Sequence, residues 1–338
     1  MTIQQALAAV VDGKDLSTEQ MQAVMRQIMT GEASDAQIGG FLVALRMKGE
    51  TVGEIAAAAG VMRELATPVT VKGDHVVDIV GTGGDVSHTF NISTACTFVV
   101  AAAGGKVAKH GNRAVSSASG SADLLEAAGV NLQLSPEQVA ECIDEVGVGF
   151  MFAPLHHSAM RHAIGPRKEM AIRTVFNVLG PLTNPAGAPN MLLGVFSDAL
   201  LETMAEVMKR LGARQVMVVH ADDGLDEITV SGKTRCAELK NGEITRFEID
   251  PAQFGLHLHP LESIQVNSPQ ESLGMIREAL QNQPGAALDA VLLNSGAALY
   301  TAGLAETLDE GIGRAREVIA DGQALGRLEA LVKKSNAF

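Results

Sequence analysis

One glycine-rich stretch, DIVGTGGDVSHTFNIST at residues 78–94, carries residue types that suit a bound anion. Gly81, Gly83 and Gly84 follow a short apolar run, and the backbone amides of such a loop can approach an anion closely. Asp85 then places a negative charge in the same loop. The spacing matches neither the Gly-Lys-Ser/Thr phosphate loop nor the GxGxxG dinucleotide motif. A tight turn between a strand and a helix would also explain the glycines, so the loop alone leaves both interpretations open.

Polar side chains gather where the next helix should begin: Thr89, Asn91, Ser93 and Thr94. Hydroxyl groups and unpaired amides at a helix N-terminus form an anion site. Ordinary N-capping is the alternative, but it needs only one such side chain. Four within six positions exceed that need and favour a ligand.

A second polar loop, KHGNRAVSSASGSAD at residues 109–123, follows the next predicted strand. Because the carboxyl ends of parallel strands lie at one edge of a sheet, the two loops are expected to face each other. Lys109 and Arg113 would supply positive charge for an anionic ligand. The other candidates in this loop are His110, Asn112, Ser116, Ser117 and Ser121. A solvated basic loop is the alternative.

Two further segments carry charges that could serve a ligand. Asp226 and Glu227 lie in DDGLDEIT, after a predicted strand, and adjacent carboxylates beside a polyphosphate suit Mg²⁺. The residues by themselves favour an acidic turn in solvent, an interpretation that also fits Asp222 and Asp223. Arg167 in HAIGPRKEM, near the start of a predicted helix, could clamp a carboxylate, or be an ordinary surface arginine.

The elements that position these residues alternate along the chain. Residues 3–66 show apolar positions at helical spacing, with Ser17 and Gln20 forming a capping box. The later strands are predicted at residues 76–80, 107–108, 150–152, 215–220 and 290–293, and TRCAELKNGEITRFEI predicts a hairpin with Asn241-Gly242 at its tip. Helices between the strands make this an α/β fold with a mostly parallel central sheet.

A long helical stretch at residues 160–179, ending in the turn-rich linker GPLTNPAGAP, interrupts the alternation. We expect it to rejoin the N-terminal helices. The predicted division is a helical domain of residues 1–72 and 164–185, and an α/β domain of residues 73–163 and 186–338.

Composition limits the possible partners and compartment. The chain has 338 residues, 46% of them hydrophobic, and a formal net charge of −13, which argues against nucleic acid because duplex binding needs a basic face. Three scattered cysteines without a CxxC pair indicate reduced thiols in a cytosol. The first residues lack the pattern of a signal peptide, and no apolar run approaches the ~20 residues of a membrane span. The prediction is a cytoplasmic protein.

Six segments resemble, in this order along the chain, the anthranilate phosphoribosyltransferase family: DIVGTGGDVSHTFNIST, KVAKHGNRAVSS, GSADLLEAAG, HAIGPRKE, RTVFNVLGPLTNPAG and GLDEIT. The resemblance implies transfer of the phosphoribosyl group from 5-phosphoribosyl-1-diphosphate (PRPP) to the amine of anthranilate, a step of tryptophan biosynthesis. It also implies Mg²⁺ dependence, a homodimer, and the fold of the pyrimidine nucleoside phosphorylases, in which a small helical domain joins a larger α/β domain.

The resemblance carries site residues over by matching position. For PRPP these are Gly81, Gly84, Asp85, Thr89, Asn91, Ile92, Ser93, Thr94, Lys109, His110, Gly111, Asn112, Arg113, Ala114, Val115, Ser116, Ser117 and Ser121. For Mg²⁺ they are Ser93, Asp226 and Glu227. For anthranilate they are Gly81, Asn112 and Arg167, with His110 and Pro181 near its path. Val86 departs from the pattern, since many members have Gly there, and a side chain would restrict the loop backbone.

The chemistry implied is displacement at the anomeric carbon of ribose. Positive charge grows on the ribose and negative charge on the leaving diphosphate, so cations and amide donors on the leaving group are needed. The aromatic amine needs no strong base, which fits the absence of a catalytic triad pattern. We hypothesise that Asp85 faces the ribose and the reaction centre, or a metal-bound water, and is the catalytic residue.

Two alternatives remain open on the sequence. A pyrimidine nucleoside phosphorylase would share the fold, but its stretch at KHGNR differs. A catalytically idle relative that binds nucleic acid is opposed by the net charge and by the intact pair Asp226 and Glu227.

Overall fold

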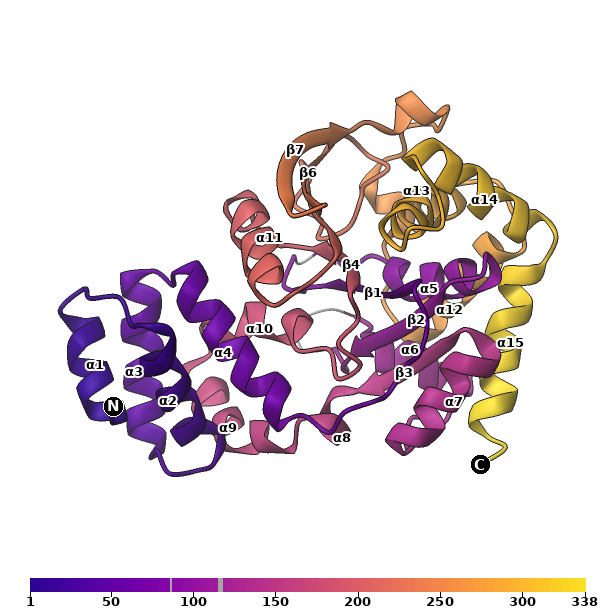
Figure 1. The fold of residues 1–338 in the computed structure, drawn as a ribbon. Helices are drawn as coiled ribbons and strands as arrows, with labels where there is room; N and C mark the ends of the chain where they lie inside the picture. Colours follow the sequence, from indigo (N-terminus) through magenta and orange to yellow (C-terminus); the bar gives the residue numbers. More distant parts are fainter. Residues whose placement is uncertain (86, 115–117) are drawn as a thin grey trace.

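The computed structural model describes residues 1–85, 87–114 and 118–338 (Figure 1). Val86 and the run Val115, Ser116, Ser117 lie outside the described residues. An N-terminal group of helices lies at one end of the molecule, and the sheet with its covering helices forms the rest (Figure 1). Among the described residues, no helix combines the length and hydropathy that crossing a bilayer requires.

The N-terminal helices begin at strong sequence signals. They are α1 (Ile3–Val11), α2 (Thr18–Met29), α3 (Asp35–Lys48) and α4 (Val52–Leu65). Each starts at a Ser or Thr N-cap whose hydroxyl accepts from the amide of the Gln or Glu three residues later, and that side chain bonds back to the cap, so the predicted box at Ser17 is confirmed. These boxes satisfy amides that a helix start otherwise leaves unpaired.

The single helical stretch predicted for residues 160–179 is wrong. A short 3₁₀ turn (Ser158–Met160) leads into α9 (Arg161–Met170), which ends at Ala171 in the left-handed region with φ 51°. A second helix, α10 (Phe176–Leu182), then includes the first residues of the segment predicted as a linker. The helical spacing of apolar residues continues across the break between α9 and α10, so this spacing could not reveal the break. As expected, this excursion returns to the N-terminal helices: α9 packs on α2 and α3, and α10 packs on α4.

The seven-stranded sheet has the order β3-β2-β1-β4-β5-β6-β7. Its strands are β1 (Val76–Gly81), β2 (Lys106–Gly111), β3 (Val148–Phe152), β4 (Asn190–Gly194), β5 (Gln215–Ala221), β6 (Thr234–Lys240) and β7 (Glu243–Ile249). β1 to β5 run parallel, and β5, β6 and β7 pair antiparallel, so the mostly parallel sheet and the hairpin are confirmed. Asn241 and Gly242 at the hairpin tip both have positive φ, as a tight hairpin turn requires.

Both faces of the central strands are buried, which explains their continuous apolar runs. In β4, Leu192 packs into one hydrophobic cluster while Met191 and Leu193 pack into the other. The first cluster lies beneath helices α5, α12, α13, α14 and α15, and the second lies against α4, α10 and α11. The helices along and around the sheet are α5 (Ile92–Ala102), α6 (Ser121–Ala127), α7 (Pro136–Val146), α8 (Ala153–His156), α11 (Leu201–Arg210), α12 (Pro269–Leu280), α13 (Ala286–Thr301), α14 (Leu308–Ala320) and α15 (Gln323–Ser335).

The strand predicted for residues 290–293 is also wrong, because these residues lie inside α13. This helix packs against α5, α12 and α14 and is buried over most of its surface, so its apolar residues show no polar face. A short apolar run of this kind looks the same in a buried helix and in a buried strand. The strand that completes the centre of the sheet is instead β4, which the sequence reasoning missed.

Candidate active site

The five parallel strands end at one edge of the sheet, and the polar loops follow β1, β2 and β5 there. Register pairs the last residue of β1, Gly81, with Gly194 of β4, and Gly194 with Val219 of β5. The loops after β1, β2 and β5 therefore leave the same edge of the sheet. This is where ligands bind in open parallel sheets.

Asp226 and Glu227 face inward from the loop after β5, toward the loop after β1 and the start of α5. The Gly83 N–H donates to Asp226 Oδ2 at 2.6 Å, and the Ser93 N–H donates to Glu227 Oε1 at 3.2 Å. Asp226 is 8% exposed. The alternative interpretation, an acidic turn facing solvent, therefore holds only for the exposed Asp222 and Asp223, and not for Asp226 and Glu227.

The loop after β5, which carries Asp226 and Glu227, approaches the ends of β1 and β4 so closely that only glycine fits there. A Cβ on Gly81 would lie 2.3 Å from Asp226 Oδ2. A Cβ on Gly194 would lie 1.5 Å from the Asp226 carbonyl oxygen. These two glycines are thus required by close approach of the backbone, which is one of the roles of glycine at ligand loops.

Lys109 lies in β2, only 2% exposed, and its ammonium reaches the start of α5. Nζ donates to the Ile79 carbonyl oxygen at 2.6 Å and to Ser93 Oγ at 3.2 Å. Burial lowers the pKa of Lys109, and the charges of Asp78 and Glu227 oppose that change. The lysine therefore brings one positive charge to the point where the carboxylates converge.

Asp78 and Asn184 support Lys109, and the sequence analysis identified neither. The β1–β2 ladder pairs Val76 with Lys106 and Val77 with Val107. Farther along, Asn184 Nδ2 bridges Asp78 Oδ2 at 2.7 Å and the Ala108 carbonyl at 2.8 Å, and the His110 N–H donates to Asp78 Oδ1 at 3.3 Å. Burial raises the pKa of Asp78 to about 6, while Lys109 opposes the shift. The sequence did contain one indication of this role, because Asp78 is an acidic residue inside an otherwise apolar strand.

Three carboxyl groups crowd one another at this edge. Burial, and after it the charge of Asp85, raises the pKa of Asp226 to about 7. Burial, and after it Asp226, raises the pKa of Glu227 to about 8. Burial also raises the pKa of Asp85, whose Oδ2 accepts a hydrogen bond from the Ser87 hydroxyl. Such crowding of like charges is relieved when a cation binds among them.

The polar residues at the start of α5 divide into two groups. The Ser93 amide and hydroxyl point to Glu227 and Lys109, as described. Asn91 instead ties two segments together, because its Oδ1 accepts from the hydroxyls of Ser119 and Ser272, both at 2.8 Å. Thr89 pairs with Gln265 in an isolated β-bridge, and Ile92 and Thr94 are buried beneath the helix start.

In the loop after β2, the positive charge of Arg113 faces α6 and not the carboxylates of the loop after β5. Arg113 forms ion pairs with Asp123 at 3.1 Å and Glu126 at 2.8 Å, both on α6. The amides of Ala114 and Gly120 donate to Asp123 Oδ2 at 2.8 and 3.0 Å. The other predicted residues of this loop are Gly111, which ends β2, Asn112, whose Oδ1 accepts from the Arg113 amide, and Ser121, the first residue of α6. Val115, Ser116 and Ser117 lie outside the described residues.

Of the residues predicted for anthranilate, Gly81 ends β1 and Asn112 follows β2, as described, and the other three lie in α9, β2 and α10. Arg167 lies in the last turn of α9 and not near a helix start, and its guanidinium packs 5.2 Å from the centre of the Phe176 ring. His110 lies in β2, with its ring 5.0 Å from that of His157. Burial, and after it His157, lowers the pKa of His110 to about 3. Pro181 is buried in α10.

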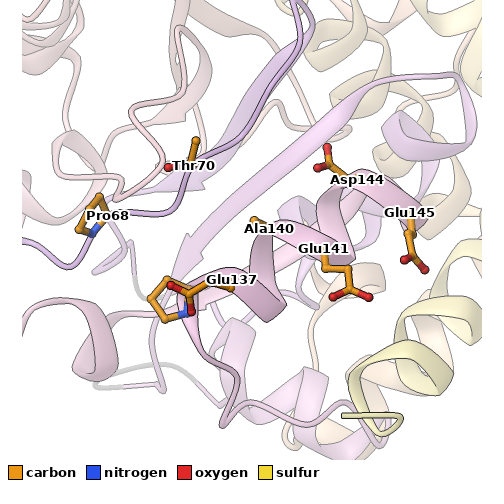
Figure 2. Close-up of a pocket in the computed structure, with 8 residues that line it drawn as sticks. Pro68, Thr70, Glu137, Ala140, Glu141, Asp144 and Glu145 are labelled. Carbon is orange, nitrogen blue, oxygen red and sulfur yellow. The ribbon is translucent and has the colours of Figure 1, made fainter.

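A surface groove of about 530 Å³ lies elsewhere and is unrelated to these loops. Figure 2 shows it between Pro68 and Thr70 on one side and the acidic residues of α7 on the other. None of its lining residues is a predicted site residue. Its carboxylates are in part neutralised, since Asp144 pairs with Lys106 at 2.6 Å and Glu145 with Lys334 at 3.0 Å.

Comparison with known proteins identifies the family. The glycosyl transferase family matches with its helical bundle domain over residues 4–66 and its a/b domain over residues 73–325. The chain is 63% identical over 332 residues to the anthranilate phosphoribosyltransferase of Thioalkalivibrio sulfidiphilus, with 98% of each chain covered. The chain belongs to the anthranilate phosphoribosyltransferase family. The resemblance seen in six short segments is thereby confirmed, and the nucleoside phosphorylase alternative is set aside.

Solved structures of the family agree with the fold. The anthranilate phosphoribosyltransferase of Thermus thermophilus matches with a TM-score of 0.93 at 46% identity, over 98% of this chain and 99% of that chain. The Saccharomyces cerevisiae enzyme in complex with PRPP and Mg matches with a TM-score of 0.90 at 28% identity, over 99% of this chain and 98% of that one. Another structure of the yeast enzyme contains 4-fluoroanthranilate and matches with a TM-score of 0.90 at 26% identity, over 99% of this chain and 98% of that one.

The residues of this chain fit the magnesium of the family. The carboxylates of Asp226 and Glu227 and the hydroxyl of Ser93 are hard oxygen donors, which Mg²⁺ prefers. Within residues 1–85, 87–114 and 118–338, no three His, Cys, Asp or Glu side chains are arranged to hold a metal by themselves. Mg²⁺ usually takes one or two carboxylates and completes its shell with water and substrate phosphate.

Proposed function

We propose that this chain transfers the 5-phosphoribosyl group from PRPP to the amine of anthranilate and releases diphosphate, in tryptophan biosynthesis. The observation that carries the proposal is the convergence of Lys109 and Glu227 on Ser93, with Asp226 and Asp85 beside them. Opposite charges meet there at the N-terminus of a helix, which suits a ligand that brings both phosphate and metal.

The leaving diphosphate is stabilised at the start of α5. Ser93, Asp226 and Glu227 would hold Mg²⁺, and the bound ion would offset the negative charge that grows on the leaving group. The buried ammonium of Lys109 adds a fixed positive charge at the same place. Because these groups are already held by hydrogen bonds, little reorganisation is needed when the bond to ribose stretches.

The remaining PRPP contacts come from both loops. Gly81, Gly84 and Asp85 cover the substrate from the loop after β1, and the polar residues of the loop after β2 close over it from the other side. In this role Arg113 exchanges its pairing with Asp123 and Glu126 for a phosphate. Arg113 and Glu126 are exposed and Asp123 is partly exposed, so water screens these pairs and the exchange has only a small free-energy cost.

Asp85 acts at the reaction centre and not on the phosphate. Its carboxylate lies beside Asp226, in a region already crowded with negative charge, so it suits the positive charge of the ribose in the transition state. Asp85→Asn should lower kcat ~10²-fold while the KM for PRPP changes less, since oriented charges of this kind contribute about that much to rate. Unchanged turnover would remove this role.

Arg167 binds the anthranilate carboxylate. Its guanidinium is half-buried against Phe176, and over the ranges that the structure covers no carboxylate lies within ion-pair distance of it. A planar guanidinium without an acid partner suits a bidentate carboxylate. Arg167→Ala should raise the KM for anthranilate and leave that for PRPP nearly unchanged, and an equal rise in both would reject the assignment.

The activity is tested by the fluorescence of anthranilate. Its consumption should require both PRPP and Mg²⁺ and should stop when a chelator is added. A parallel incubation with a pyrimidine nucleoside and phosphate should give no free base. Consumption that continues without PRPP, or phosphorolysis of the nucleoside, would overturn the proposal.

The higher organisation is proposed on the same basis. The helical domain comprises residues 1–72 and 164–185, and the α/β domain residues 73–163 and 186–338. The packing of α9 and α10 on α2, α3 and α4 supports assigning this segment to the helical domain, and the start of α9 at Arg161 places the junction a few residues before 164. The chain acts as a cytoplasmic homodimer. Light scattering, and limited proteolysis near residues 72, 163 and 185, would test the dimer and the domain boundaries.

A further inference from the structure

The segment between α9 and α10 reaches the glycine-rich loop through Arg173. The guanidinium of Arg173 lies over the Phe196 ring, 4.1 Å from its centre, and donates a hydrogen bond to the Gly84 carbonyl. Arg46 of α3 donates in turn to the Arg173 carbonyl. Arg173 thus connects a helix of the N-terminal group to the loop that carries Asp85.

Phe196 is itself fixed to the same loop. Its N–H donates to Thr82 Oγ1 at 3.2 Å, and the Thr82 N–H donates to the Gly194 carbonyl at 2.9 Å. The Gly83 N–H donates to Asp226. Each of the three residues before Asp85 therefore has a hydrogen bond that holds its backbone, and the one at Gly84 comes from Arg173.

The bond at Gly84 determines the direction of the next amide. A trans peptide is planar, so its C=O and N–H point to opposite sides. When Arg173 holds the Gly84 carbonyl, the Asp85 N–H must point away from Arg173. Gly83 and Gly84 both have positive φ, at 67° and 78°, and glycine rotates easily between conformations. The hydrogen bond from Arg173 is thus the contact that holds the Gly84 carbonyl in its observed orientation.

We propose that Arg173 is a positioning residue for the transferase reaction, fixing the Gly84–Asp85 peptide so that PRPP meets a preformed loop. The inference rests on the proposed function of that loop. The stacking on Phe196 matters because it limits the directions in which the guanidinium can donate, which a flexible ammonium would not reproduce.

The test compares two replacements of Arg173 with a matched control. Arg173→Met keeps most of the aliphatic length and removes the donor, and Arg173→Lys keeps a charge without the planar fork. Arg173→Met should raise the KM for PRPP about tenfold, the effect of losing ~1.4 kcal/mol of binding. The KM for anthranilate should stay within about twofold. Arg173→Lys should lie between Arg173→Met and the parent.

Arg214→Met is the control, because Arg214 is also exposed and also donates to a backbone carbonyl, that of Asp74, beside the opposite end of β1. It should leave both KM values unchanged. Hydrogen exchange gives a readout independent of turnover: amides of residues 82–85 should exchange faster in Arg173→Met and at the parent rate in Arg214→Met.

The possible results separate the two proposals. Parent-like KM for PRPP and parent-like exchange in Arg173→Met would overturn the positioning role while leaving the transferase function intact. Equal rises in both KM values, or equal effects from Arg214→Met, would show a general structural effect and also overturn it. Failure of the parent protein to consume anthranilate with PRPP would instead overturn the proposed function, and the exchange measurement would still decide whether Arg173 orders the loop.

Discussion

The loops after β1 and β2 leave the same edge of the sheet, but their charged residues have different partners. In the first loop, Gly83 bonds to Asp226 and Gly84 to Arg173, so the loop is joined to the turn after β5 and to the segment before α10. In the second, Arg113 pairs with Asp123 and Glu126 on the helix that follows it. Gly83 and Gly84 are therefore held by distant parts of the chain, whereas Arg113 is held by the helix that directly follows its loop. If the proposed function holds, we expect the first loop to form a preformed half of the site and Arg113 of the second to change partners when PRPP binds.

The largest expected effect comes from the partner of the first loop. Asp226→Asn removes a carboxylate whose oxygen accepts from Gly83 and that we assign to Mg²⁺. The value of kcat/KM for PRPP should fall ~10²–10³-fold, the range seen when a charge-stabilising group is removed from an active site. Steady-state kinetics at saturating anthranilate measures this.

Asp222→Asn is the matched control, because Asp222 belongs to the same turn but is exposed and pairs with Arg235 at 3.1 Å. It should keep nearly full activity. Equal losses in the two variants would mean that the inward and outward carboxylates of this turn do not differ in function.

A smaller effect is expected from the second loop. Arg113→Met should raise the KM for PRPP about tenfold with little change in kcat, because it removes one charge-assisted contact to phosphate. Glu126→Gln weakens the present pairing of Arg113 and should not raise that KM. If Arg113→Met lowers kcat as strongly as Asp226→Asn, the second loop belongs to the preformed half, and the contrast between the loops is wrong.

The smallest effect is on stability and depends on pH. Burial, and after it the charge of His156, lowers the pKa of His157 to about 4, below the ordinary 6.5. A histidine with a depressed folded-state pKa contributes stability that is present above about pH 6.5 and is lost as the pH falls toward 4. His157→Gln cannot take up that proton. Between pH 7 and pH 4.5 it should therefore lose less unfolding free energy than the parent, by ~1–3 kcal/mol.

Urea denaturation at the two pH values measures this difference, with the exposed His257→Gln as control. A parallel loss in His157→Gln and the parent would contradict the pH dependence assigned to His157. The His157 ring lies 5.0 Å from that of His110 near the end of β2, so this result also reports on the packing at that end of the strand.

The sequence predicted the positions of the loops better than the directions of their side chains. Strand ends and glycines located both loops because those signals are local. The partner of Arg113 could not be predicted, since Asp123 and an anionic ligand are equally plausible partners in a sequence. The inward direction of Asp226 depends on how β5 lies beside β4, and β4 had not been recognised. Arg173 has no motif of its own, and its role appears only when Gly84 and Phe196 are seen beside it.

The errors in secondary structure have a common cause. In α13 and in β4, burial on all sides removes the polar positions that distinguish a period of 3.6 from a period of 2. The break at Ala171 was missed for a different reason. The residue there has positive φ but is neither glycine nor proline, so no residue type in the sequence indicates the end of the helix. Where caps and hairpin residues were present, as at Ser17 and at Asn241-Gly242, the prediction was correct to the residue.

The contact between Gly194 and the Asp226 backbone has a consequence for how this protein can vary. A library randomised at codon 194 and selected for growth without tryptophan should return glycine alone, because even the methyl group of alanine would overlap the carbonyl of residue 226. Codon 187 offers a contrast, since Gly187 has open space around it and a φ of 58° that asparagine tolerates. Two glycines a few residues apart should thus show opposite mutational tolerance. Of the two, only Gly194 at the end of β4 lies so close to the Asp226 backbone that no side chain fits.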